Sequence, residues 1–267
     1  GARMDRWLVR AARVIGTASG AFAGIVGVQY LRLRRMTFLP PYPGFDIDHT
    51  VTPASGATDE EPIRLAVFGD STTAGVGVDR PQDALPYALA QRIAEAEGRD
   101  VHVVNFGWAG ARAADLAGAQ VPAAAADPFL ARVDIVAVVV GSNDATHRTG
   151  PRQFRAALRQ AFSAIRATAP GAMVVHAGIP QFRGALRTLE PLMFITDHYA
   201  RLLRPIARAE AARAGVAYAD LARDVPPRIR GRTDILSSDR FHPAAPGYAA
   251  WADVIADALI RARAISA

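Results

Sequence analysis

Four short segments of the sequence gather residue types that could perform nucleophilic catalysis. They are 69–71 (Gly-Asp-Ser), 105–110 (Asn-Phe-Gly-Trp-Ala-Gly), 141–144 (Gly-Ser-Asn-Asp) and 239–243 (Asp-Arg-Phe-His-Pro). A serine hydroxyl is a poor nucleophile at neutral pH, and a neighbouring imidazole can take its proton and return it to the leaving group. A carboxylate can hold that imidazole in one tautomer, and the three-residue spacing of Asp239 and His242 lets one short loop present both.

Each segment taken alone has an ordinary structural explanation. Gly-Asp-Ser favours turns, and Ser-Asn-Asp can bond to its own backbone. His242 could be a loop histidine whose neighbour, Pro243, opens a helix. These explanations do not account for the order of the four segments or for their placement at the ends of predicted elements.

Short apolar runs alternate with longer helical patterns from residue 63 onward, which is typical of a parallel sheet with helices on both faces. We therefore expect an α/β fold with three α/β/α layers and a five-stranded parallel sheet. Since ligands bind at the carboxyl ends of parallel strands, the first three segments should meet at one edge. The predicted strands are 63–68, 101–106, 134–140, 172–177 and 216–219, and the predicted helices are 82–97, 111–120, 151–168, 190–214 and 245–264.

In this order the four segments resemble the SGNH, or GDSL-like, hydrolase family, and the resemblance extends over residues 65–251. It implies a flavodoxin-like α/β/α fold. It also implies Ser71 as nucleophile, His242 as general base and Asp239 as the group that orients the histidine. The backbone N–H groups of Ser71 and Gly110 and the side chain of Asn143 would form the oxyanion hole, with Gly107 as the alternative to Gly110.

The expected activity is hydrolysis of a carboxylic ester, of a short acyl group or a lipid, through an acyl-serine intermediate and without metal or cofactor. Acyl transfer to, or deacetylation of, a cell-envelope sugar would use the same residues, and a non-catalytic, membrane-tethered binding module is the non-enzymatic alternative. An α/β-hydrolase is disfavoured because Thr73 stands where its Gly-x-Ser-x-Gly turn needs glycine.

The N-terminal region carries an uncharged run at 14–31 between arginines, at the length threshold of a membrane span. We interpret residues 1–61 as a membrane-anchor helix and linker, and residues 62–267 as the catalytic domain. A helix packed on a soluble domain and a cleaved signal peptide are the alternatives. A membrane or cell-envelope location follows, but the arginines on the two flanks nearly balance and do not set the orientation.

The remaining composition narrows the functional classes. The net charge of +6 comes from arginines dispersed along helices, because the chain has no lysine, so a nucleic-acid surface is not expected. The absence of cysteine excludes disulfides and thiolate zinc sites. Several polar residues receive minor predictions: Asp70 and Asp144 brace loops, His102 and His176 are structural, His147 and His198 are candidates for the cleft, and 182–199 forms either an acyl-pocket wall or ordinary helix packing.

Overall fold

The computed structural model describes residues 2–35, 44–183, 185 and 189–266. In this part of the chain, six strands form one sheet in the order β1-β3-β2-β4-β5-β6. Five of them are parallel, and β1 pairs with β3 in the antiparallel direction. The strands are β1 (Asp48–Val51), β2 (Ile63–Gly69), β3 (Val101–Asn105), β4 (Ile135–Val139), β5 (Met173–Ala177) and β6 (Ala217–Ala219).

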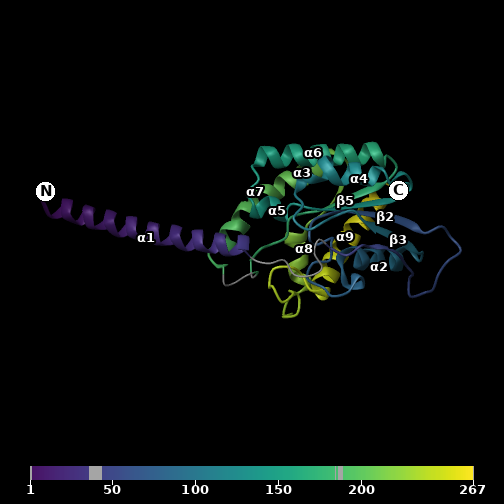
Figure 1. Cartoon of the computed structure of the whole chain (residues 1–267), viewed down its shortest axis with the longest axis horizontal. Coiled ribbons are helices and arrows are strands. Elements are labelled where there is room, and N and C mark those ends of the chain that lie inside the picture. Colours follow the sequence, from purple (N-terminus) through teal and green to yellow (C-terminus); the bar gives the residue numbers. More distant parts are fainter. Residues whose placement is uncertain (1, 36–43, 184, 186–188, 267) are drawn as a thin grey trace.

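Helices cover both faces of this sheet (Figure 1). Pro151 opens α6, and Gly98 closes α2 in a left-handed conformation with φ of 62°, as expected for a first-turn proline and a helix-ending glycine. The helices are α1 (Ala2–Arg35), α2 (Leu85–Glu97), α3 (Ala113–Asp115), α4 (Val121–Ala125), α5 (Ser142–Thr146), α6 (Pro151–Thr168), α7 (Leu192–Arg213), α8 (Leu221–Arg228) and α9 (Ala245–Ser266), with shorter turns η1 (Pro81–Asp83), η2 (Leu116–Gln120) and η3 (Leu130–Arg132).

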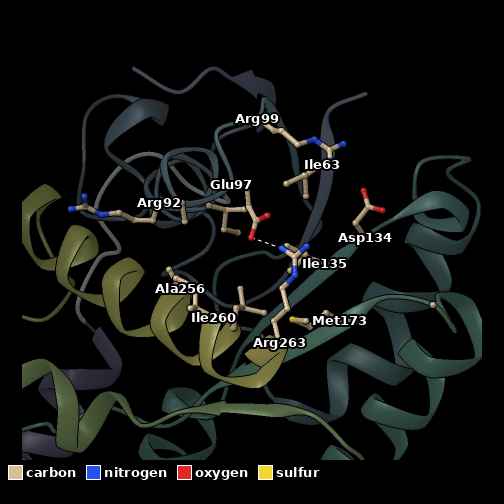
Figure 2. Close-up of a pocket in the computed structure, with 14 residues that line it drawn as sticks. Ile63, Arg92, Glu97, Arg99, Asp134, Ile135, Met173, Ala256, Ile260 and Arg263 are labelled. Atoms are coloured by element: carbon tan, nitrogen blue, oxygen red, sulfur yellow. Dashed lines mark hydrogen bonds and ion pairs between the residues drawn. The ribbon is translucent and has the colours of Figure 1, made fainter. Parts of the chain in front are cut away.

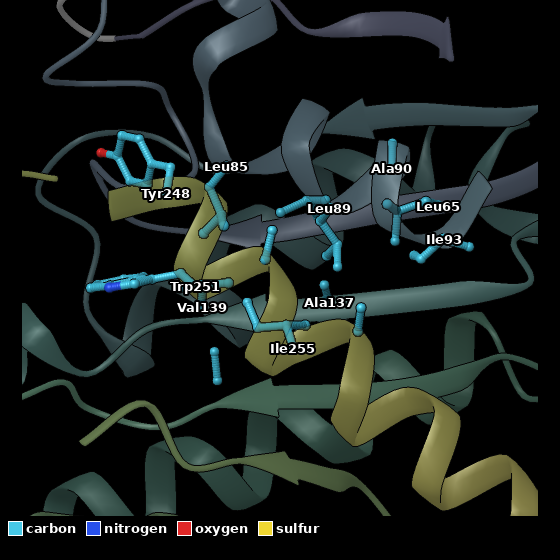
Figure 3. Packing of buried hydrophobic residues seen from close by; sticks show 14 of the residues in the cluster. Leu65, Leu85, Leu89, Ala90, Ile93, Ala137, Val139, Tyr248, Trp251 and Ile255 are labelled. Carbon is cyan, nitrogen blue, oxygen red and sulfur yellow. The ribbon is translucent and has the colours of Figure 1, made fainter. Parts of the chain in front are cut away.

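Alternate residues of each central strand enter two separate hydrophobic cores. In β2, Leu65 and Val67 face the core under α2 and α9, whereas Ala66 and Phe68 face the core under α3, α6 and α7. Figure 3 shows the first core, in which Leu65 lies among side chains of α2 and α9. The two cores establish the predicted three-layer α/β/α architecture.

The five predicted parallel strands are confirmed, and β1 adds a sixth at the edge. Its residues belong to the segment for which we expected a linker. Ile47, directly before β1, is fully buried, and Val51 pairs with Val101, so this segment is part of the sheet and its core. The domain boundary at Pro62 stays a prediction, and the proline-rich stretch at 40–43 lies outside the described residues.

The strand order reverses direction between β2 and β4. The chain runs from β2 to β3 on one side of β2, and then crosses to β4 on its other side. Open parallel sheets bind ligands at such a switch point. Ser71 follows the carboxyl end of β2 and Asn143 follows that of β4. Both residues therefore lie at the crevice that this topology creates.

The expected N-terminal helix is present as α1, which projects from the body of the molecule (Figure 1). Its segment Arg13–Leu33 is long and apolar enough to cross a membrane, a property that signal sequences also have. Within the described residues it is the one helix that meets these conditions, and only 6% of its most apolar stretch is buried.

Candidate active site

The loop after β2 presents Ser71 in a tight, self-bonded turn. Asp70 Oδ1 accepts hydrogen bonds from the N–H (3.0 Å) and the hydroxyl (2.8 Å) of Thr72, and the N–H of Val76 donates to the carbonyl of Ser71 (3.0 Å). Burial raises the pKa of Asp70, and the bonds from Thr72 offset part of that rise. These contacts fix the backbone on both sides of the serine.

Ser71, His242 and Asp239 form a continuous chain of hydrogen bonds, although 171 residues separate the serine from the histidine. Ser71 Oγ lies 2.9 Å from His242 Nε2, and His242 Nδ1 lies 2.6 Å from Asp239 Oδ2. Ser71 and His242 are buried at 7% and 4% exposure, so bulk water competes little for these bonds. The arrangement can remove a proton from the serine hydroxyl.

The second carboxylate oxygen of Asp239 organises the loop that carries the histidine. Oδ1 accepts from the hydroxyl of Ser237 (2.7 Å) and from the N–H groups of Phe241 (2.8 Å) and His242 (2.9 Å). Burial alone would raise the pKa of Asp239, but the bonds from His242, Phe241 and Ser237 lower it to about 2. Asp239 is therefore an anion across the whole range in which proteins are normally assayed.

The predicted oxyanion-hole donors are the N–H groups of Ser71 and Gly110 and the side chain of Asn143. In the described part of the chain, neither the N–H of Ser71 nor that of Gly110 has an acceptor. Asn143 donates one Nδ2 hydrogen to the carbonyl of Ala111 (2.9 Å), which ties it to the loop of Gly110 and leaves its second hydrogen for a ligand. The three predicted donors thus belong to one connected group of loops.

The choice between the two glycines is informed by their contacts. The N–H of Gly107 already donates to Asn105 Oδ1 (3.1 Å), and a side chain at Gly107 would collide with the hydroxyl of Thr73. Gly110 has φ of +88°, a conformation in which side chains are strained, and open space around its Cα. Gly107 is therefore a glycine because of close packing, and its N–H is already used. This favours Gly110 as the oxyanion-hole donor.

A cavity of about 550 Å³ opens beside Ser71 and His242. Pro180, Phe182 and Ala185 form part of one wall, so the start of the predicted wall segment does line the site, whereas its later part is the first turns of α7. The rest of the wall includes Val225, Ile229, Leu236 and Trp251. Polar side chains, among them Arg183, Arg232 and Arg240, also line the cavity, so it suits a ligand with an apolar and a polar portion.

A second cavity, of about 330 Å³, lies at the opposite edge of the sheet (Figure 2). Ile63, Ile135 and Met173 mark it as the amino ends of β2, β4 and β5. Ion pairs such as Arg263 with Glu97 rim it, and none of the described residues lining it is a serine or a histidine. No three His, Asp or Glu side chains among the described residues are placed to hold a metal ion.

Some predictions for the minor polar residues are confirmed, and those for His147 and His198 are not. Asp70 braces the serine loop, and Asp144 Oδ2 accepts from the N–H of Ala113 (2.9 Å), as expected of bracing residues. His176 is fully buried in β5, as expected of a structural residue. His147 and His198 are not among the described residues that line the cavity beside Ser71; His147 instead faces α1.

Gln120 is a site residue that the sequence did not reveal. It is fully buried, its Oε1 accepts from the N–H of Gly69 (3.0 Å), and its Nε2 donates to the carbonyl of Gly69 (2.7 Å). Both bonds hold the backbone two residues before Ser71. The signal available was one amide in an alanine-rich helix, which is too weak to predict this contact.

The comparisons with known proteins show the family of the chain. Residues 67–250 match the model of the GDSL-like lipase/acylhydrolase family, a stretch longer than half of the chain. The chain belongs to this family. The resemblance found from the four segments is thereby confirmed.

One relative of this GDSL-like chain is a protein named as an esterase. It is 28% identical over 195 residues to the GDSL-like esterase Rv1075c of Mycobacterium tuberculosis, a match that covers 72% of this chain and 60% of that relative. The chain thus spans less than two thirds of the length of that relative.

Solved structures of GDSL-like and related hydrolases share the fold. The crystal structure of TesA has a TM-score of 0.58 at 24% identity, covering 74% of this chain and 99% of its own. An extracellular lipase from Streptomyces rimosus has a TM-score of 0.58 at 21% identity, covering 73% and 99%. These similarities confirm the α/β/α fold around a mostly parallel sheet.

Proposed function

We propose that this GDSL-like protein is a serine hydrolase of carboxylic esters, with Ser71 as nucleophile, His242 as general base and Asp239 as the orienting carboxylate. The observation that carries the proposal is the 2.9 Å contact of Ser71 Oγ with His242 Nε2, beside a cavity with both apolar and polar lining residues. Membership of a lipase/acylhydrolase family and similarity to a protein named as an esterase support it.

The reaction follows from the contacts. His242 Nε2 takes the proton as Ser71 Oγ attacks the carbonyl carbon, and the resulting oxyanion accepts hydrogen bonds from the N–H groups of Ser71 and Gly110 and from Asn143 Nδ2. Breaking of the ester bond expels the alcohol, which receives the proton from His242. Water then repeats the sequence on the acyl-serine, releases the acid and restores the hydroxyl.

Substitution of the serine tests the proposal. Ser71→Ala should lower kcat/KM for p-nitrophenyl butyrate by at least about 10³-fold, because no other group can form the acyl intermediate. Ser238→Ala, an exposed serine in the loop of Asp239, is the matched control and should stay within about twofold of the parent, as expected of a surface substitution. Turnover by Ser71→Ala equal to that of Ser238→Ala would refute the assignment.

We also propose that α1 anchors the protein in a membrane through residues 14–31. An uncharged run with exposed side chains such as Val14, Ile15 and Phe22 supports this, since such a surface is stable in lipid rather than in water. Vesicle flotation of the full chain is the test. Protein that remains a detergent-free monomer and does not float would contradict the anchor.

A further inference from the structure

The last turns of α1 are docked on the body of the protein, whereas residues 13–25 of that helix are exposed. Val26 and Leu33 are partly buried against a small cluster formed by Leu189, Leu192 and Met193. Gln29, between them, is only 8% exposed. The spacing of 26, 29 and 33 places all three on one face of the helix.

Gln29 makes a two-sided contact with the backbone at the start of α7. Its Nε2 donates to the carbonyl of Glu190 (2.5 Å), and its Oε1 accepts from the N–H of Leu192 (3.1 Å). Both polar ends of the amide are satisfied, so the contact fixes one position and one rotation of α1 against the body. We call Val26, Gln29 and Leu33 with their partners the α1 junction.

Apolar contacts connect the α1 junction to the active site. The cluster of Leu189, Leu192 and Met193 also packs against Phe241. The ring of Phe241 stacks on Phe182 with centroids 6.2 Å apart, and its edge-to-face partner is His242 at 5.2 Å. Phe182 and Phe241 both line the cavity beside Ser71, so the wall of this cavity is continuous with the docking surface of α1.

The direction of α1 relates the active site to a membrane. In Figure 1 the helix leaves the body on the side of α5, which follows the carboxyl end of β4, while the C-terminus lies at the opposite end. The segment Arg13–Leu33 has 21 residues, but its last turns are docked on the body, so residues 13–25, about 20 Å long, are the part of it left to enter a bilayer. A bilayer that this part of the helix enters would face the carboxyl ends of the strands.

The face around the junction has the chemistry of a membrane-contacting surface. Phe194, in the first turn of α7, is 50% exposed. Arg148, Arg183 and Arg240 are exposed on neighbouring loops, and none of them forms an ion pair with another described residue. Exposed apolar side chains beside unpaired cations suit the acyl region and anionic headgroups of lipids.

We propose that the α1 junction holds the carboxyl-end face of the sheet against the bilayer, and that the substrate of the Ser71 site is an acyl ester of a membrane lipid that enters from the leaflet. This inference rests on the proposed function for the chemistry at Ser71. It adds the substrate class and the surface from which the substrate arrives.

The first test compares two esters with one enzyme. The full chain is reconstituted in vesicles of phosphatidylcholine and phosphatidylglycerol, and hydrolysis is measured for a long-chain diacylglycerol ester in the vesicles and for p-nitrophenyl butyrate in water. Gln29→Ala should lower turnover of the vesicle ester about tenfold through loss of orientation, and leave kcat/KM for p-nitrophenyl butyrate within about twofold. Val28→Ala, an exposed neighbour on α1, is the matched control and should behave as the parent on both esters.

The outcomes separate this inference from the proposed function. A Gln29→Ala variant that matches the parent on both esters, or that loses both equally, overturns the orienting role. A parent that cleaves p-nitrophenyl butyrate but not the vesicle ester overturns the substrate class and leaves the esterase proposal standing. A parent that cleaves neither ester overturns the esterase proposal and the substrate class with it.

The second test measures orientation without any reaction. Because the chain has no cysteine, Phe194→Cys and Ser55→Cys each allow one nitroxide label on the full chain in vesicles. Ser55 lies in the exposed loop between β1 and β2, at the amino ends of the parallel strands. The label at 194 should collide mainly with membrane-dissolved oxygen and the label at 55 mainly with a water-soluble nickel chelate. Equal accessibility of the two labels to the nickel chelate would overturn the inference.

Discussion

The carboxylate of Asp239 has two separate duties, one for each oxygen. Oδ2 receives His242 Nδ1, and Oδ1 receives three donors that shape the loop. An asparagine at this position keeps an oxygen for the loop but replaces the acceptor of the imidazole proton with an amide. The two duties can therefore be separated by substitution.

Asp239→Asn should retain more activity than His242→Ala, since the aspartate positions the base and the histidine is the base. Loss of an orienting aspartate has cost about 10⁴-fold in kcat in another serine hydrolase, with the geometry intact. Hydrogen bonds from His242, Phe241 and Ser237 lower the pKa of Asp239 to about 2, so Asp239 stays ionised above pH 4 and a fall in parent kcat/KM above that pH has another cause. A pH profile of kcat/KM for the parent and both variants checks this. Activity of His242→Ala above that of Asp239→Asn would contradict the roles.

Asn143 is expected to act on the transition state rather than on substrate binding. Asn143→Ala should lower kcat by about 10²- to 10³-fold with little change in KM, the cost of removing one oxyanion donor. Steady-state kinetics on p-nitrophenyl butyrate measure both constants. A loss confined to KM would mean that Asn143 positions the substrate instead.

At the scale of elements, the end of β2 is held by a side chain from a distant turn. Gln120, at the end of η2, bonds both polar groups of Gly69, and no other side-chain amide contacts this peptide in the described residues. The clamp links the helical layer to the loop that presents Ser71. Its removal would leave the buried N–H of Gly69 without a partner, whereas the carbonyl of Gly69 would keep the N–H of Trp108 (3.2 Å).

Gln120→Ala should therefore lower both stability and kcat. Gln120→Glu should restore neither, because it buries a carboxylate, which has no hydrogen to donate, against the carbonyl of Gly69. The expected stability cost of Gln120→Ala is about 1–3 kcal/mol for the unsatisfied N–H. Urea unfolding and kcat measurements check the pair. Gln153→Ala, at an exposed position of α6, is the control for loss of a glutamine. A Gln120→Ala variant as stable and active as Gln153→Ala would show that the clamp has no role.

The elements of this chain differ in how far the sequence predicts them. The five parallel strands follow from runs of β-branched residues, and Ser71, Asn143 and His242 follow from segments placed at the ends of elements. Strand β1 was not predicted because Asp48–Val51 has one buried residue, Val51, and three exposed ones, so it lacks the apolar run by which the other strands were recognised. Gln120 and the α1 junction depend on single amides that meet backbone far away in sequence, and no local pattern records such contacts.

At the scale of the whole molecule, stability should depend on pH through His176. This histidine is fully buried in β5, and burial lowers its pKa from the usual 6.5 to about 4. Its Nδ1 lies 3.1 Å from the carbonyl of Val138, while Nε2 has no partner among the described residues. Between pH 6.5 and pH 4 the unfolded chain binds the proton more tightly than the folded one, so stability falls as pH falls through this window.

His176→Leu should remove this part of the pH dependence. Between pH 7 and pH 4 the parent should lose about 3 kcal/mol more than the variant, and carboxyls such as Asp70 and Asp144 contribute equally to both proteins. Urea unfolding at several pH values measures the difference. His49→Leu, at an exposed position, should keep the slope of the parent. An unchanged slope in His176→Leu would show that His176 does not titrate with folding.

The central claim is that one hydroxyl, that of Ser71, is activated by His242 for attack on an acyl carbon. The most direct measurement is reaction of the full chain with a fluorophosphonate probe, followed by mass spectrometry of the labelled peptide. We expect a single adduct on Ser71, absent in Ser71→Ala and formed far more slowly in His242→Ala. An adduct on another residue, or labelling of Ser71→Ala at the rate of the parent, would contradict it.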